Sequence, residues 1–64
     1  MTLLLRHADG FRDIGKVEFK DGIVKSTTHL GNTEYDPLRG MKGWIEKSVR
    51  EYAMKCNWIV SVMP

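Results

Sequence analysis

The longest regular pattern of apolar and polar positions lies in residues 41–56, MKGWIEKSVREYAMKC. The apolar side chains recur at steps of three and four residues, which places them on one side of an α-helix, and the charged side chains fall on the other side. We therefore predict a helix over residues 41–56. The side chains that we expect it to bury are Trp44, Ile45, Val49, Tyr52, Ala53 and Cys56.

The residues around this helix predict how it begins and ends. Asp36 and Pro37 form a helix-start signal, but Gly40 and Gly43 each cost about 1 kcal/mol relative to Ala within a helix. We expect a loose turn at 37–40 before the helix proper. Asn57 is predicted to end the helix by adopting the left-handed backbone conformation.

The remaining apolar segments predict four strands, at residues 2–6, 11–20, 23–30 and 58–63. Asp9-Gly10 and Asp21-Gly22 are turn dipeptides, so the first three strands should form a β-meander. Alternation along the second strand directs Phe11, Val17 and Phe19 to the core, and Gly15 indicates a bulge or kink. In the third strand, alternation directs Val24, Ser26, Thr28 and Leu30 inward and Lys25, Thr27 and His29 outward.

These elements predict an α+β fold with one four-stranded mixed sheet in the order 4-1-2-3. If the helix carries the chain back along the sheet, the final strand runs parallel to the first. The helix then packs on one face of the sheet. We expect residues 1–64 to form a single small domain.

Composition narrows the possible functions. The net charge of +2 and pI near 8.9 are mildly basic, and no apolar run approaches the length of about 20 residues needed to span a bilayer. The single cysteine, Cys56, suits a reducing compartment, so we expect a cytoplasmic protein. His7, His29 and Cys56 match no compact ligand or nucleophile spacing, and we expect no enzyme activity, metal or cofactor.

The segment 31–40, GNTEYDPLRG, is long for a connection in so small a domain. It brings Tyr35, Leu38 and Arg39 close in sequence to Trp44, and Tyr, Trp and Arg dominate many protein–protein contacts. We predict a partner-binding site at these four residues. The alternative is a segment tucked over the helix start, with Tyr35 and Leu38 closing the core.

The uncovered sheet face offers a second candidate surface. Arg12, Lys16, Lys20 and Lys25 could neutralise phosphates of a nucleic acid. The alternative is a solvated face whose lysines guard the sheet against aggregation. If residues 58–63 lie at an edge of the sheet, they could also pair with a strand of a second copy to give a homodimer.

The order of the predicted elements and the size of the chain resemble those of two known kinds of protein. Three strands followed by a helix, with Leu30-Gly31 after the third strand, resemble the arm-binding N-terminal domain of tyrosine recombinases, whose sheet enters the DNA major groove. The size and element order are similar to small host-takeover inhibitors made by bacteriophages. The sequence as a whole favours a small binding protein, of inhibitor or adaptor type, that covers a surface of a larger macromolecular partner.

Overall fold

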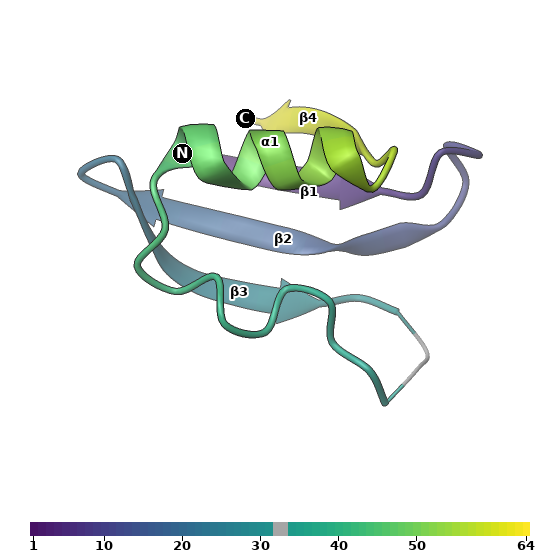
Figure 1. Cartoon of the computed structure of the whole chain (residues 1–64), viewed down its shortest axis with the longest axis horizontal. Helices are drawn as coiled ribbons and strands as arrows, with labels where there is room; N and C mark the ends of the chain where they lie inside the picture. The colour runs from purple at the N-terminus through teal and green to yellow at the C-terminus, as the bar shows by residue number, and fades with distance from the viewer. Residues whose placement is uncertain (32–33) are drawn as a thin grey trace.

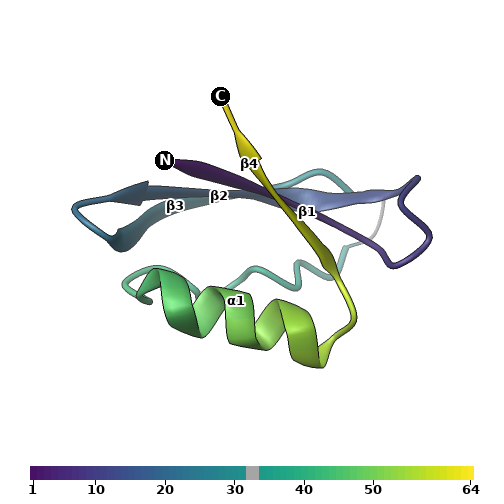
Figure 2. The ribbon, with the colours of Figure 1, turned by 90° about the horizontal axis from the view of Figure 1, so that it is seen from above.

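The computed structural model describes residues 1–31 and 34–64, so residues 32 and 33 of the predicted 31–40 connection lie outside the described residues. The fold is α+β. Strands β1 (Thr2–Arg6), β2 (Asp13–Lys20), β3 (Ile23–His29) and β4 (Ile59–Met63) form one sheet in the order β3-β2-β1-β4. Helix α1 (Glu46–Lys55) packs on one face of this sheet, and no described segment covers the other face (Figures 1 and 2).

The direction of β4 differs from the prediction. Thr2 pairs with Met63 and Arg6 pairs with Ile59, so β4 is antiparallel to β1 and the whole sheet is antiparallel. The parallel assignment was wrong because it used the helix alone to carry the chain back. In the structure, the segment between β3 and α1 already carries the chain back along the sheet. It ends at Ile45, which forms an antiparallel bridge with Ile23 at the start of β3. Helix α1 therefore starts at that end, and β4 runs back toward it (Figure 1).

Helix α1 is shorter at its start than predicted. Gly40 and Gly43 adopt φ angles of +91° and +93°, which a right-handed helix cannot contain, so residues 37–44 form turns and α1 begins at Glu46. The predicted stop at Asn57 is confirmed by its φ of +60°. Trp58 N–H donates to the Ala53 carbonyl over 2.8 Å, which completes a Schellman motif.

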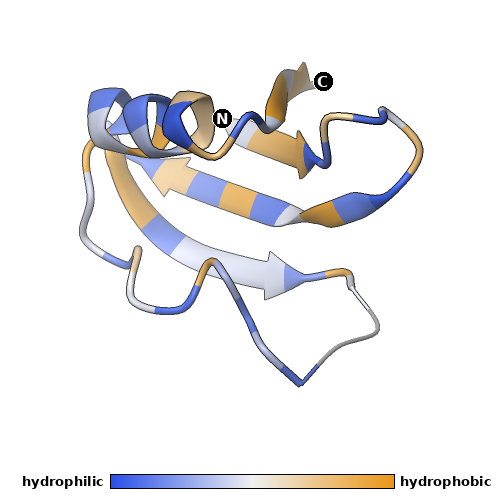
Figure 3. Ribbon diagram, turned by 45° about the vertical axis from the view of Figure 1, so that its right-hand side comes forward, coloured by the Kyte–Doolittle hydropathy of each residue, from blue (hydrophilic) through white to orange (hydrophobic). Residues whose placement is uncertain are grey.

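The core lies between the sheet and a second layer made of α1 together with residues 38–41. Figure 3 shows hydrophobic and hydrophilic residues in alternation along β2, as expected for a strand with one buried face. Ile45 and Cys56, which the helical pattern placed in the core, are exposed because they cap the two ends of α1 instead of lying within it. The buried side chains are Leu3, Leu5, Ile14, Val17, Phe19, Val24, Leu38, Met41, Val49 and Ala53.

Two irregularities set which side chains face the core. The bulge predicted near Gly15 is confirmed by a register shift between Leu5 and Arg6, which leaves Ile14 and Gly15 both buried. A second register shift lies between Glu18 and Phe19, opposite Lys25. It reverses the alternation predicted for the rest of β3. Thr27 pairs with Val17 and His29 with Gly15, so both face inward, whereas Ser26 and Thr28 pair with Glu18 and Lys16 and face outward.

Candidate partner-binding site

The four residues predicted to bind a partner occupy different environments. Tyr35 is 71% exposed and Arg39 is exposed, whereas Trp44 is half-buried against the core. Leu38 is completely buried. Leu38 therefore has no side-chain surface to offer a partner. It closes the core as the alternative expected, whereas Tyr35, which the alternative also placed in the core, is exposed.

Asp36 holds this segment in shape. Its carboxylate accepts a hydrogen bond of 2.9 Å from the Leu38 N–H, and its carbonyl accepts one of 3.2 Å from the Arg39 N–H. Asp at the first position of a turn satisfies backbone donors in this way. The turn directs Leu38 into the core and leaves the side chain of Arg39 outside.

Beside this segment, three aromatic rings form a row. The ring of Tyr52 on α1 lies 5.9 Å from that of Trp44, at an interplanar angle of 73°, and 5.5 Å from that of Trp58, at 65°. Edge-to-face pairs at these distances contribute about 0.5–1.5 kcal/mol each beyond their buried area. The Schellman motif places Trp58 directly after the helix, and the turns at Gly40 and Gly43 place Trp44 directly before it.

Tyr35 lies close to this row. The pKa of Tyr52 is raised above its ordinary value of 10.0, first by the charge of the neighbouring Cys56 thiolate, then by partial burial and by Tyr35. Tyr35 also lines the same hollow as Trp58, which places it beside the end of the row. We refer to Tyr35, Trp44, Tyr52 and Trp58 as the aromatic cluster.

Two hollows adjoin the aromatic cluster. One, of about 550 Å³, runs along α1 and is lined by Gly43, Trp44, Ile45, Ser48, Glu51, Tyr52 and Lys55. The other, of about 640 Å³, lies at the end of the sheet and includes Tyr35, Trp58, His7 and His29 in its wall. Tyr52 connects them, since it lines the first and packs against Trp58 of the second.

The basic residues of the alternative site are not gathered into one patch. Lys16 and Lys20 lie on the open face of β2, but Glu18 stands between them. Lys25 lies at the bulge in β3, and Arg12 donates to Asp9 in the hairpin connection over 2.8 Å. The structure therefore leaves Lys16 and Lys20 as the two members of this set that share the open face.

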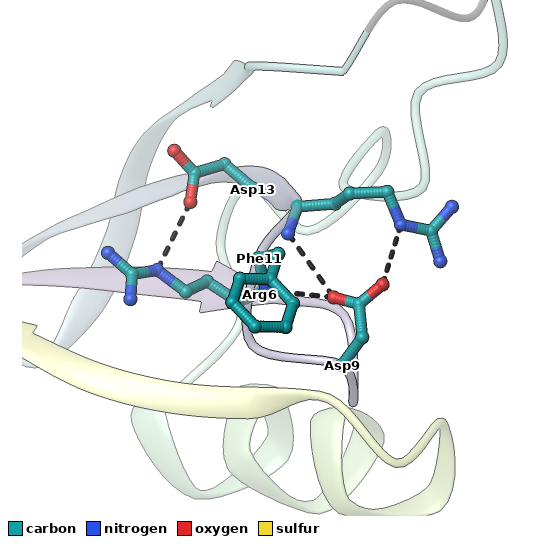
Figure 4. A network of polar contacts seen from close by, with 5 residues as sticks. Arg6, Asp9, Phe11 and Asp13 are labelled. Atoms are coloured by element: carbon teal, nitrogen blue, oxygen red, sulfur yellow. Dashed lines mark hydrogen bonds and ion pairs between the residues drawn. The ribbon is translucent and has the colours of Figure 1, made fainter.

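The connection between β1 and β2 presents an aromatic side chain that the sequence pattern misassigned. Phe11 was expected in the core, but β2 begins only at Asp13 and Phe11 is 92% exposed. The Asp9 carboxylate accepts hydrogen bonds from the Phe11 and Arg12 N–H groups, at 2.9 and 3.3 Å (Figure 4). These bonds hold the backbone in a turn that directs Phe11 outward. The Asp-Gly signal predicted the turn but not its six-residue length.

His7, His29 and Cys56, the residues considered for metal binding or catalysis, do not lie together. His7 and His29 line the same hollow, whereas Cys56 is exposed at the end of α1. Among the described residues there is no group of three or more His, Cys, Asp or Glu side chains placed to hold a metal ion. Nor does the described part of the chain contain a helix with the length and apolar character needed to cross a membrane.

Comparisons with protein-family models, with curated proteins and with solved structures gave no significant match to this chain.

Proposed function

We propose that this chain is a small non-enzymatic binding protein that covers a surface of a larger protein partner, as an inhibitor or adaptor does. The proposal rests on the aromatic cluster, in which Tyr52 packs edge-on between Trp44 and Trp58, and the exposed Tyr35 lines the same hollow as Trp58. Tyr, Trp and Arg supply most of the binding energy in many protein interfaces.

The arrangement also limits the entropy lost on binding. Trp44, Tyr52 and Trp58 are already packed against one another and against the core, so a partner would not have to immobilise them. Tyr35 and Arg39 are both exposed, so both side chains are accessible to a partner.

A capture experiment tests the proposal. The tagged chain is incubated with a lysate of the cells that produce it, with and without nuclease, and retained proteins are identified. We expect one specific protein whose retention is insensitive to nuclease. Tyr35→Ala and Arg39→Ala should each weaken its capture severalfold, because both side chains are exposed and their loss leaves the core intact.

The matched control is Thr28→Ala, which alters an exposed side chain on the open face of the sheet. It should leave capture unchanged. Trp44→Ala is informative only in a variant shown to be folded, since Trp44 also packs against the core. Equal capture by the wild type, Tyr35→Ala and Arg39→Ala would refute the site. Capture that disappears with nuclease would favour a nucleic-acid partner at Lys16 and Lys20 instead.

A further inference from the structure

Strand β4 forms an edge of the sheet. It pairs with β1 on one side, and no described segment pairs with its other side. An edge strand exposes a row of unpaired backbone N–H and C=O groups, which can pair with a strand of another chain.

The opposite edge, β3, is protected. Ile45 forms a bridge with Ile23, the Val24 N–H donates to the Trp44 carbonyl over 2.8 Å, and the Gly43 N–H donates to the Val24 carbonyl over 3.0 Å. The bulge at Lys25 adds a charge and a kink to the same edge. Charges, bulges and covering loops are the usual protections of sheet edges. Strand β4, with the sequence IVSVM, has no charged residue, no proline and no register shift.

The sequence of β4 is also nearly symmetric about its centre. Read from either end, it places Ser61 in the middle, a valine on each side of it, and a large apolar residue, Ile59 or Met63, at each end. A strand of this kind is complementary to an antiparallel copy of itself, because a two-fold axis through the central residue pairs like with like.

We propose that a second copy of this chain pairs with the free edge of β4 in antiparallel orientation, with the two-fold axis at Ser61. The result is one continuous eight-stranded sheet. Each Ser61 lies opposite the other, and Val60 of each copy lies opposite Val62 of the other. Ile59 lies opposite Met63 of the second copy on the open face. Such a two-fold axis is perpendicular to the sheet, so both helices lie on the same face.

The contact covers surface that the single chain leaves exposed. Val62 is 58% and Ile59 is 42% exposed, although both are apolar residues of a strand. Strand β4 has no charged side chain to repel its copy, and the pairing brings apolar side chains opposite one another across the contact. A chain this short buries only about 60% of the surface that its unfolded form exposes. The additional apolar surface buried at the dimer contact would therefore stabilise the fold.

This inference goes beyond the proposed function and does not depend on it. The hollow along α1 is lined by residues 43–45 and by Ser48, Glu51, Tyr52 and Lys55, none of which belongs to β4. A dimer would therefore carry two copies of that hollow, and loss of dimerisation would not by itself remove partner binding.

Cysteine cross-linking tests both the pairing and its register. Directly opposed residues of antiparallel strands have Cα atoms about 4.5–5.5 Å apart, within the range of about 4.4–6.8 Å that a disulfide spans. In a Cys56→Ser background, we expect mild oxidation to convert the Ser61→Cys variant to a covalent dimer. Val62→Cys should not form one, because its position faces Val60 of the other copy. Ser26→Cys, on the outward face of β3, is the control for random collision.

Sedimentation of the unmodified chain completes the test. At sub-millimolar concentration we expect a species of twice the 7.4 kDa chain mass. Ser61→Lys, which places two like charges at the axis, should give a folded monomer, whereas Ser26→Lys should remain dimeric. A monomeric wild-type chain would overturn the proposal. So would cross-linking of Val62→Cys or Ser26→Cys as rapid as that of Ser61→Cys.

Discussion

Leu38 lies directly against the backbone of Gly15. A Cβ atom added at Gly15 would stand 2.6 Å from Cδ1 of Leu38 and would overlap the carbonyl oxygen of Thr28. The contact joins the segment before α1 to the bulge in β2. Residues 38–41 are therefore part of the second layer of the fold, beside α1, and they contribute Leu38 and Met41 to the core.

Gly15→Ala should destabilise the fold. The added methyl group meets backbone on one side and a fully buried side chain on the other, so we expect a loss near the upper end of the range of about 1–3 kcal/mol found for overpacked cores. Urea denaturation measures the loss. Ser26→Ala, at an exposed position of β3, should change the unfolding free energy by less than about 0.5 kcal/mol. Equal stability of the two variants would contradict the packing at Gly15.

Leu38→Ala tests whether this segment belongs to the core. Truncation of a fully buried leucine should lower the unfolding free energy by about 2–5 kcal/mol. Arg39→Ala, at the next and exposed position, should change it by less than about 0.5 kcal/mol. A small effect of Leu38→Ala would mean that the segment is a surface loop without a structural role.

Asp9, in the connection between β1 and β2, should make the stability of the fold depend on pH in the acid range. Hydrogen bonds from the Phe11 N–H and the Arg12 side chain hold the pKa of Asp9 below its ordinary value of 3.8. As the pH falls below that value, Asp9 takes up a proton first in the unfolded state. Its contribution to stability is thus present above 3.8 and is lost as the pH falls through the pKa of the folded state.

NMR titration of the Asp9 carboxyl group checks the direction of this shift. In the Asp9→Asn variant the acid-dependent contribution should already be absent at neutral pH, and the Phe11 amide should exchange faster with solvent. A titration midpoint at or above 3.8 for Asp9 would contradict the hydrogen bonds of the turn.

Alkaline titration should reveal the contact between α1 and its C-terminal cap. The pKa of Tyr52 is raised chiefly by the Cys56 thiolate, so Cys56→Ala should lower it toward 10.0, as measured by tyrosinate absorbance. Because the folded pKa is the higher one, the unfolded chain ionises first above pH 10.0 and stability falls as the pH rises. Cys56→Ala should weaken that fall. An unchanged Tyr52 titration would show that the two side chains do not interact.

The apolar pattern predicted the α+β class, the strand order and the existence of the helix because these follow from periodicity and from turn dipeptides. Asp21 and Gly22, with φ of 54° and 79°, form the predicted hairpin turn. Asn57 ends the helix region as predicted. Each of these features depends on a few neighbouring residues, and such local features are present in the sequence itself.

Three of the errors arose where one residue or one contact changed the phase of a pattern or the direction of the chain. One extra residue at Lys25 exchanged the two faces of β3, and the positive φ of Gly43 moved the start of α1. The bridge between Ile23 and Ile45 reversed β4. In the candidate site, Tyr35 and Trp44 were singled out by residue type and by nearness in sequence, whereas Tyr52 was assigned to the core and Trp58 to the last strand. Only tertiary packing joins these four residues into one cluster.

NMR of the indole N–H signals of Trp44 and Trp58, recorded while the captured protein partner is added, tests directly whether the aromatic cluster binds that partner. The chain has two tryptophans, so both signals can be assigned by single substitution to Phe. We expect both signals, and the amide of Tyr35, to shift or broaden with partner concentration, while the amides of Lys16 and Lys20 remain in place. Shifts confined to Lys16, Lys20 and the open face of the sheet would contradict the account.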